Sequence, residues 1–161
     1  MLVGSHGTLA RWLLPDWNRD QAPTPRDIAG AAAALGAPYT LVTGIAVSDQ
    51  HFDNVLANAH QALLNQRFER FDASFSGAGD TLSAALAALL SSGEDIETSA
   101  REALGYLDRC LDGGFRPGMG HALPDRMFWA QIESDGADAG PQSAEPASAE
   151  SFGMPSGDTR H

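Results

Sequence analysis

A glycine-rich turn directly before the most apolar helical stretch is the feature that most restricts the fold of this chain. The turn has the sequence Ser76-Gly77-Ala78-Gly79-Asp80 and follows residues with strand propensity. Its two glycines allow backbone angles that other residues avoid, and they let a ligand approach the backbone closely. At the start of a helix, such a turn directs successive N–H groups into one concavity, which favours anions such as phosphate. The sequence therefore predicts an anion-binding junction between a strand and a helix.

Two helices are predicted after this turn. Apolar residues recur at helical spacing from Thr81 to Ser91, and again from Ile96 to Leu111. The glycine pair Gly113-Gly114 is typical of the end of a helix. Because only residues 92–94 separate the two helical patterns, we expect the helices to pack antiparallel.

Helix and strand patterns also alternate before the turn. Thr24 is a good N-cap, and the helix that it begins should extend to Leu35. The β-branched segment 39–45 predicts a buried strand. Segments 62–64 and 68–71 predict two short strands separated by Asn65-Gln66, as in a hairpin or an edge ladder. This alternation is typical of the α/β class.

Composition limits the classes of partner. The 161 residues include 43% hydrophobic side chains, enough for the core of one domain. Ten basic against 21 acidic residues give a net charge of −11, which disfavours nucleic acid and anionic membranes as partners. A single cysteine, Cys110, excludes an internal disulfide and suits a reducing compartment. With neither a signal peptide nor 18 consecutive apolar residues, we expect a cytoplasmic address.

The composition changes at Glu133. From there to His161 the chain is rich in Ser, Ala, Gly, Pro and acidic residues, with almost nothing to bury. We therefore expect residues 1–132 to form the folded part and residues 133–161 to be a disordered acidic tail.

Asp80 is the candidate catalytic residue. A carboxylate at the start of a helix can accept a proton from a substrate hydroxyl, while neighbouring amides stabilise a phosphoryl group. Alternatively, Asp80 is only the helix N-cap and the glycines only form a tight turn. The sequence has no lysine, so arginine must supply any positive contact; Arg116 and Arg126 are candidates, although structural roles are expected for both. The histidines fall at no metal-ligand spacing, so no metal site in the protein is predicted.

The segment Asp72–Leu86 resembles the C-terminal signature of the ribokinase superfamily. Within it, Thr81–Ala85 is similar to the branch that contains hydroxymethylpyrimidine/phosphomethylpyrimidine kinase, with pyridoxal kinase as a close relative. Residues 39–44 resemble a family strand near the nucleotide. Gly118-Met119-Gly120 and Pro124–Trp129 resemble the C-terminal end of bacterial members. The resemblance covers about residues 9–131.

The resemblance implies a three-layer α/β/α sandwich that is incomplete, because the family domain is about twice as long and its N-terminal half is absent. It implies a kinase that uses ATP and Mg²⁺ on a small-molecule substrate, the hydroxymethyl group of a heteroaromatic vitamin precursor. Asp80 would deprotonate the substrate hydroxyl. The remaining implied site residues are Gly77, Ala78 and Gly79 around the phosphate, and Thr43, Gly44, Gly118, Met119 and Gly120 around the nucleotide.

Several alternatives stay open at this point. Many pyrimidine kinases have Cys at the position of Asp80, whereas sugar kinases and pyridoxal kinases have Asp. A thiamin-pathway pyrimidine is favoured as the acceptor, and pyridoxal or pyridoxine is the alternative. A truncated chain could also be a catalytically inactive nucleotide-binding fragment. An incomplete sheet would have an exposed edge that needs a partner, which leaves a homodimer open.

Overall fold

The computed structural model describes residues 1–18 and 20–130. The chain divides into two units, Met1–Phe128 and Trp129–His161, and every element described below lies in the first. The predicted tail, residues 133–161, lies outside the described residues. No helix of the described ranges has the length and apolar character that crossing a membrane requires.

A four-stranded mixed sheet forms the middle layer, in the order β1-β2-β3-β4. Strand β1 (Leu2–Ser5) runs parallel to β2 (Thr40–Ala46), and β3 (His51–Ala57) and β4 (Ala62–Glu69) continue as an antiparallel meander. Because parallel neighbours need a crossover, the chain between β1 and β2 supplies two helices.

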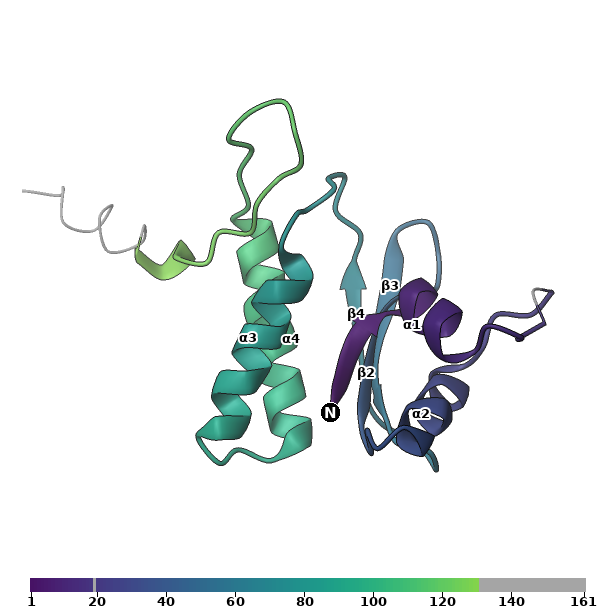
Figure 1. Ribbon diagram of the computed structural model, residues 1–161. Coiled ribbons are helices and arrows are strands. Elements are labelled where there is room, and N and C mark those ends of the chain that lie inside the picture. The colour runs from purple at the N-terminus through teal and green to yellow at the C-terminus, as the bar shows by residue number, and fades with distance from the viewer. Residues whose placement is uncertain (19, 131–161) are drawn as a thin grey trace, which may run out of the picture. The chain divides into compact units, whose positions relative to one another are not determined.

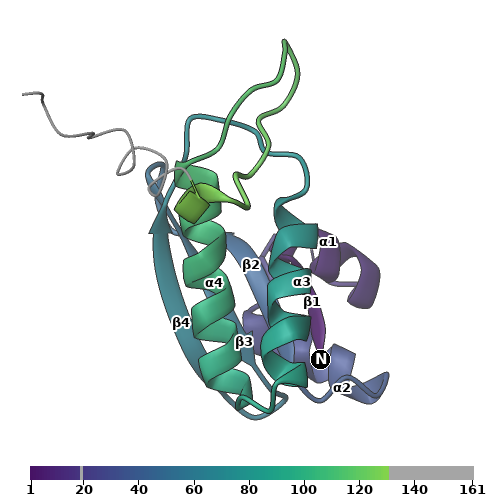
Figure 2. The ribbon, with the colours of Figure 1, turned by 90° about the vertical axis from the view of Figure 1, so that its left-hand side faces the viewer.

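Helices cover both faces of this sheet, as Figure 1 shows. Helices α1 (His6–Leu13) and α2 (Pro25–Ala34) lie on one face and contact β2 and β3. Helices α3 (Ala78–Ser91) and α4 (Ile96–Asp112) lie side by side on the other face, antiparallel to each other (Figure 2). The predicted three-layer α/β/α arrangement and the predicted antiparallel helix pair are confirmed.

The core follows the period-two alternation of the strands. Leu41 and Leu56 are fully buried against α3 and α4, in a cluster that includes Leu82 and Leu104. The next residue in β2, Val42, instead packs on the opposite face against the α1 and α2 side chains. Complete burial of a leucine stabilises the fold by about 1.5–3 kcal/mol, so both helical layers are held to the sheet by apolar contact.

The helix predicted from Thr24 is confirmed with its cap. The Thr24 hydroxyl accepts a hydrogen bond from the Asp27 N–H, and the Asp27 carboxylate accepts one from the Thr24 N–H at 2.8 Å. The pKa of Asp27 is lowered, first by the hydrogen bond from the Thr24 side chain and then by the one from its backbone. The strand predicted over residues 39–45 is confirmed as β2.

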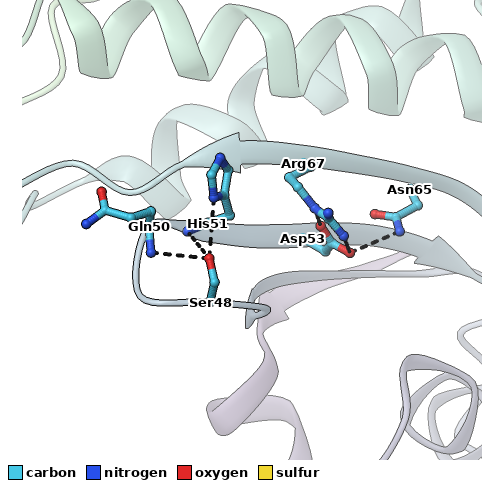
Figure 3. A network of polar contacts seen from close by, with 6 residues as sticks. All are labelled: Ser48, Gln50, His51, Asp53, Asn65 and Arg67. Carbon is cyan, nitrogen blue, oxygen red and sulfur yellow. Dashed lines mark hydrogen bonds and ion pairs between the residues drawn. The ribbon is translucent and has the colours of Figure 1, made fainter.

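The prediction of two short strands at 62–64 and 68–71 is wrong, because residues 62–69 form the single strand β4. Asn65 and Gln66 do not form a turn but lie within β4. The Asn65 and Arg67 side chains point from β4 to Asp53 of β3, as Figure 3 shows. The Arg67 Nε donates to Asp53 at 2.7 Å, and the Asn65 amide donates to it at 3.1 Å. Asn65 and Arg67 are therefore paired across strands, and the partner strand β3 was not predicted from the sequence.

Strand β1 is one edge of the sheet. Within the described ranges it pairs only with β2, so its other side has no strand neighbour. The exposed edge expected for this sheet is present at β1, although β1 itself and α1 were not predicted.

Candidate active site

The glycine turn forms the N-terminus of α3. Gly77 is the N-cap residue, with φ of 84°. Its carbonyl accepts two hydrogen bonds from Thr81, one from the N–H at 3.0 Å and one from the hydroxyl at 2.8 Å. Ala78, Gly79 and Asp80 form the first helical turn, whose N–H groups have no acceptor inside the helix. Free N–H donors and the positive end of the helix dipole are the features that the predicted anion site requires.

The two glycines have different reasons to be glycine. Gly77 has a left-handed backbone, and an added Cβ would lie 3.1 Å from the Arg126 guanidinium. The expectation that Gly79 also needs unusual angles is wrong: its φ is not positive, and an added Cβ would meet no atom within 4 Å. Gly79 instead borders open space, where a side chain would occupy volume available to a ligand.

Asp80 is not the N-cap, so the interpretation of this residue as a simple cap is wrong. It is the third residue of α3, and its side chain is exposed. No hydrogen bond or ion pair within residues 1–18 and 20–130 engages its carboxylate, which is therefore available to a substrate.

A cavity of about 180 Å³ brings two of the predicted phosphate residues together with two of the predicted nucleotide residues. Thr43 and Gly44 within β2 line it, as do Ala78 and Gly79. These two segments are far apart in the sequence, and the sheet and α3 place them at one site. The other lining residues are Phe52, Asn54, Phe68, Leu82, Leu107, Asp108 and Leu111.

Gly44 reaches this cavity through a break in the β2 ladder. The β2–β3 register shifts between Val42 and Ile45, and Gly44 has a φ of 68°. Its N–H donates to the side-chain oxygen of Asn54 at 3.1 Å, and Asn54 is only 2% exposed. At the bulge, the buried Asn54 side chain thus accepts the hydrogen bond that a backbone carbonyl of β3 would accept in a regular ladder. This bond fixes Gly44 at the cavity. Asn54 was not predicted from the sequence, and the only local signal was an amide residue directly before the apolar residues 55–57.

A carboxyl group lies on the α4 side of the cavity. Burial raises the pKa of Asp108, and the nearby carboxylates of Asp112 and Glu69 raise it further. Its charged form is therefore disfavoured in the fold.

Two larger cavities are linked to this first one through shared lining residues. The second cavity, of about 400 Å³, shares Gly44, Phe52 and Ala78 with the first and adds Phe71 and Phe75. The third cavity, of about 580 Å³, shares Arg70 and Phe71 with the second. We call the three together the trough, which runs from Gly79 past Phe52 to Arg70.

The predicted nucleotide loop Gly118-Met119-Gly120 lies at the far end of the trough. Met119 and Gly120 line the third cavity together with Arg116, away from the glycine turn. The other candidate cation, Arg126, reaches the turn itself, because its Nε donates to the Thr81 hydroxyl at 2.9 Å. The two candidate arginines therefore lie at different places, Arg116 at the third cavity and Arg126 at the glycine turn.

The side chains fit Mg²⁺ only as a companion of bound phosphates. Within the described part of the chain, no group of three or more His, Cys, Asp or Glu side chains could hold a metal ion. Mg²⁺ commonly keeps several waters and uses one or two carboxylates plus substrate phosphates. The exposed Asp80 beside the anion site suits that mode, whereas an all-protein cage is not formed by these residues.

Comparison with solved structures shows the fold. Pyridoxal kinase from Staphylococcus aureus, in complex with AMP-PCP, matches with a TM-score of 0.67 and 14% identity, over 81% of this chain and 48% of that chain. An ADP complex of Bacillus subtilis pyridoxal kinase matches with a TM-score of 0.66 and 20% identity, over 81% and 51%. A Bacteroides thetaiotaomicron protein named provisionally as a phosphomethylpyrimidine kinase matches with a TM-score of 0.55 and 14% identity, over 70% and 40%.

The chain spans about half the length of these solved structures. No curated protein sequence matches it. The family model for phosphomethylpyrimidine kinase matches residues 11–125, a range that includes the glycine turn, Asp80 and most of the trough. The chain therefore belongs to the phosphomethylpyrimidine kinase family, and its fold is that of the ribokinase-like α/β kinases.

Proposed function

We propose that this chain is the phosphate-binding and catalytic-base part of an ATP-dependent kinase that phosphorylates the hydroxymethyl group of a small heteroaromatic vitamin precursor. The observation that carries the proposal is the glycine turn. In a chain of this family, it presents free amides at a helix N-terminus and an exposed, unengaged carboxylate next to Gly79, which lines one end of the trough.

Each part of the turn has a role in this proposal. The N–H groups of Gly77, Ala78 and Gly79 hold the transferring phosphoryl group and stabilise the charge on its oxygens. The Asp80 carboxylate accepts the proton of the attacking hydroxyl, which leaves the oxygen free to bond to phosphorus. ATP supplies the phosphoryl group, and Mg²⁺ offsets the charge of its phosphates.

The rest of the nucleotide extends along the trough. Thr43 and Gly44 border the phosphates, because they share a cavity with Gly79. Phe52, Phe71 and Phe75 line the second cavity, and they offer an apolar surface for a flat base. The Met119–Gly120 segment lines the far end. Of the predicted nucleotide residues, Thr43, Gly44, Met119 and Gly120 line the trough and Gly118 does not.

A pyrimidine is the favoured acceptor because the matching family model is that of phosphomethylpyrimidine kinase. Pyridoxal is the second candidate. Several of the solved structures with this fold are pyridoxal kinases. The residue at the expected base position is Asp80 rather than the Cys of many pyrimidine kinases.

Nucleotide binding is the first test. Calorimetric titration of the 161-residue chain with AMP-PCP should give binding in MgCl₂ that weakens in EDTA. Absence of any binding would contradict the proposal. ADP production by the chain alone, with ATP, Mg²⁺ and hydroxymethylpyrimidine, should scarcely exceed background, because the chain spans about half of a kinase of this fold.

Transfer is tested in a fusion that places the N-terminal half of a family member before Met1. We expect hydroxymethylpyrimidine to be phosphorylated with a higher kcat/KM than pyridoxal. The reverse order would assign the pyridoxal alternative. A fusion that binds AMP-PCP but phosphorylates neither acceptor would favour a catalytically inactive binding module instead.

A further inference from the structure

A side chain from the C-terminal loop reaches the glycine turn from 45 residues away. The Arg126 Nε donates to the Thr81 hydroxyl oxygen at 2.9 Å, and the same hydroxyl donates to the Gly77 carbonyl at 2.8 Å. A hydroxyl donates one proton and can also accept hydrogen bonds. Because the Thr81 oxygen accepts from Arg126, which has no acceptor atom in its side chain, the Thr81 proton is donated to the Gly77 carbonyl. Thr81 is 4% exposed, which removes water as a competing partner. Arg126, Thr81 and Gly77 therefore form an ordered chain of hydrogen bonds, which we call the turn relay.

The backbone that carries Arg126 is fixed to α4. The Tyr106 hydroxyl donates to the Arg126 carbonyl at 3.1 Å, and the Asp125 N–H donates to the Cys110 carbonyl at 2.7 Å. The Asp125 carboxylate in turn accepts from the Met127 N–H at 2.9 Å. Anchors before and after Arg126 prevent its backbone from following the side chain, so the guanidinium acts on the turn from a fixed base.

The guanidinium also lies against the turn. One terminal nitrogen is 3.1 Å from the position that a Cβ of Gly77 would take. No hydrogen bond or ion pair among the described residues engages the terminal nitrogens of Arg126. Within the described part of the chain no carboxylate pairs with its charge, which adds to the positive end of α3 beside the proposed anion site.

The geometry points to Arg126 as a positioning residue for the phosphate site. Through Thr81 it fixes the left-handed conformation of Gly77, and with it the direction in which the first N–H groups of α3 point. This inference rests on the proposed function, because the direction of the amides matters only if an anion binds there. Arg126 is not assigned a contact with the reacting atoms.

The relay is tested by AMP-PCP affinity, measured calorimetrically with MgCl₂ on the full 161-residue chain. Arg126→Gln should weaken binding by about tenfold or more, as expected for loss of a hydrogen bond made by a charged group. Arg101→Gln is the matched control, because it also removes one positive charge, but from a residue of α4 that does not contact the turn. It should change AMP-PCP affinity less than about twofold. Melting temperatures of the two variants should agree within a few degrees.

Variants of Thr81 separate the relay from general electrostatics. Thr81→Val should also weaken AMP-PCP binding, and the double variant should be no weaker than Arg126→Gln, which already breaks the relay. Thr81→Ser keeps the hydroxyl and should bind like wild type. Additive losses in the double variant, or wild-type affinity in Arg126→Gln, would overturn the inference.

Amide hydrogen exchange gives a readout that needs no ligand. The Thr81 N–H donates to the N-cap carbonyl of α3, as the Ser99 N–H donates to the N-cap carbonyl of α4. Arg126→Gln should speed exchange at Thr81 and leave Ser99 unchanged. If wild type does not bind AMP-PCP, the proposed function fails and exchange alone decides the relay. Equal exchange at Thr81 in wild type and Arg126→Gln then shows that Arg126 does not position the turn.

Discussion

Replacing each glycine of the turn by alanine should have opposite effects on stability. Gly77 has a φ of 84°, and a residue with a Cβ costs about 1–2 kcal/mol in that conformation. The 3.1 Å contact with the flexible end of Arg126 adds to this cost. Gly79 lies inside α3 with open space around it, where alanine is favoured over glycine by about 0.5–1 kcal/mol. The free energies of unfolding of the two variants should therefore differ by about 1.5–3 kcal/mol.

Urea unfolding of the 161-residue chain, followed by circular dichroism, measures this difference, and AMP-PCP titration measures the effect on binding. Gly77→Ala should be the less stable variant. Gly79→Ala should be as stable as wild type or more stable, yet bind AMP-PCP more weakly because its methyl group enters the cavity beside Thr43 and Gly44. Gly30→Ala in α2 has equally open space and serves as the control for binding. If Gly77→Ala were as stable as Gly79→Ala, the left-handed geometry assigned to the turn would be refuted.

Three other predictions concern separate parts of the chain. In the fusion with an N-terminal half, Asp80→Asn should lower kcat by about 100- to 10,000-fold with little change in AMP-PCP affinity or melting temperature, since Asp80 is not a cap; a change within a few-fold would remove Asp80 from the mechanism. The hydrogen bond from Arg67 lowers the pKa of Asp53, so its contribution to stability is present at neutral pH and is lost as pH falls below about 4. The difference in unfolding free energy between wild type and Asp53→Asn should thus shrink from pH 7 to pH 3, and a constant difference would contradict this. Removing residues 134–161 should leave the melting temperature nearly unchanged, because their composition offers little apolar surface to bury, and a loss of several degrees would show that they pack on the domain.

Local signals predicted the elements whose residues suffice to define them. The Thr24 cap and the apolar periodicity of α3 and α4 act within a few residues, so the sequence alone indicated these helices. Strand β4 was divided in error because Asn65 and Gln66 resemble a turn when their partners are not known. Only the pairing of β4 with β3 shows that Asn65 has Asp53 as its partner.

The site shows the same division between local and distant information. The turn Ser76–Asp80 could be predicted from five consecutive residues, because the chemistry of a glycine turn before a helix is local. The bond from Gly44 to Asn54 spans ten residues, and the one from Arg126 to Thr81 spans 45, so neither follows from spacing. The need for glycine at 79 was also misassigned, since the open space beside it exists only after β2 and α3 pack.

The pairing of the glycine turn with the C-terminal loop determines when the site can form during synthesis. The Ser76 N–H donates to the Ala122 carbonyl at 2.9 Å, and the Ala122 N–H donates to the Ser74 carbonyl at 2.9 Å. A ribosome adds about 5–20 residues per second, so the turn emerges several seconds before the segment that orders it. The sheet and the α3–α4 pair contain only residues that precede this segment, and they can fold first. Competence to bind a phosphate group should therefore be the last property that the nascent domain acquires.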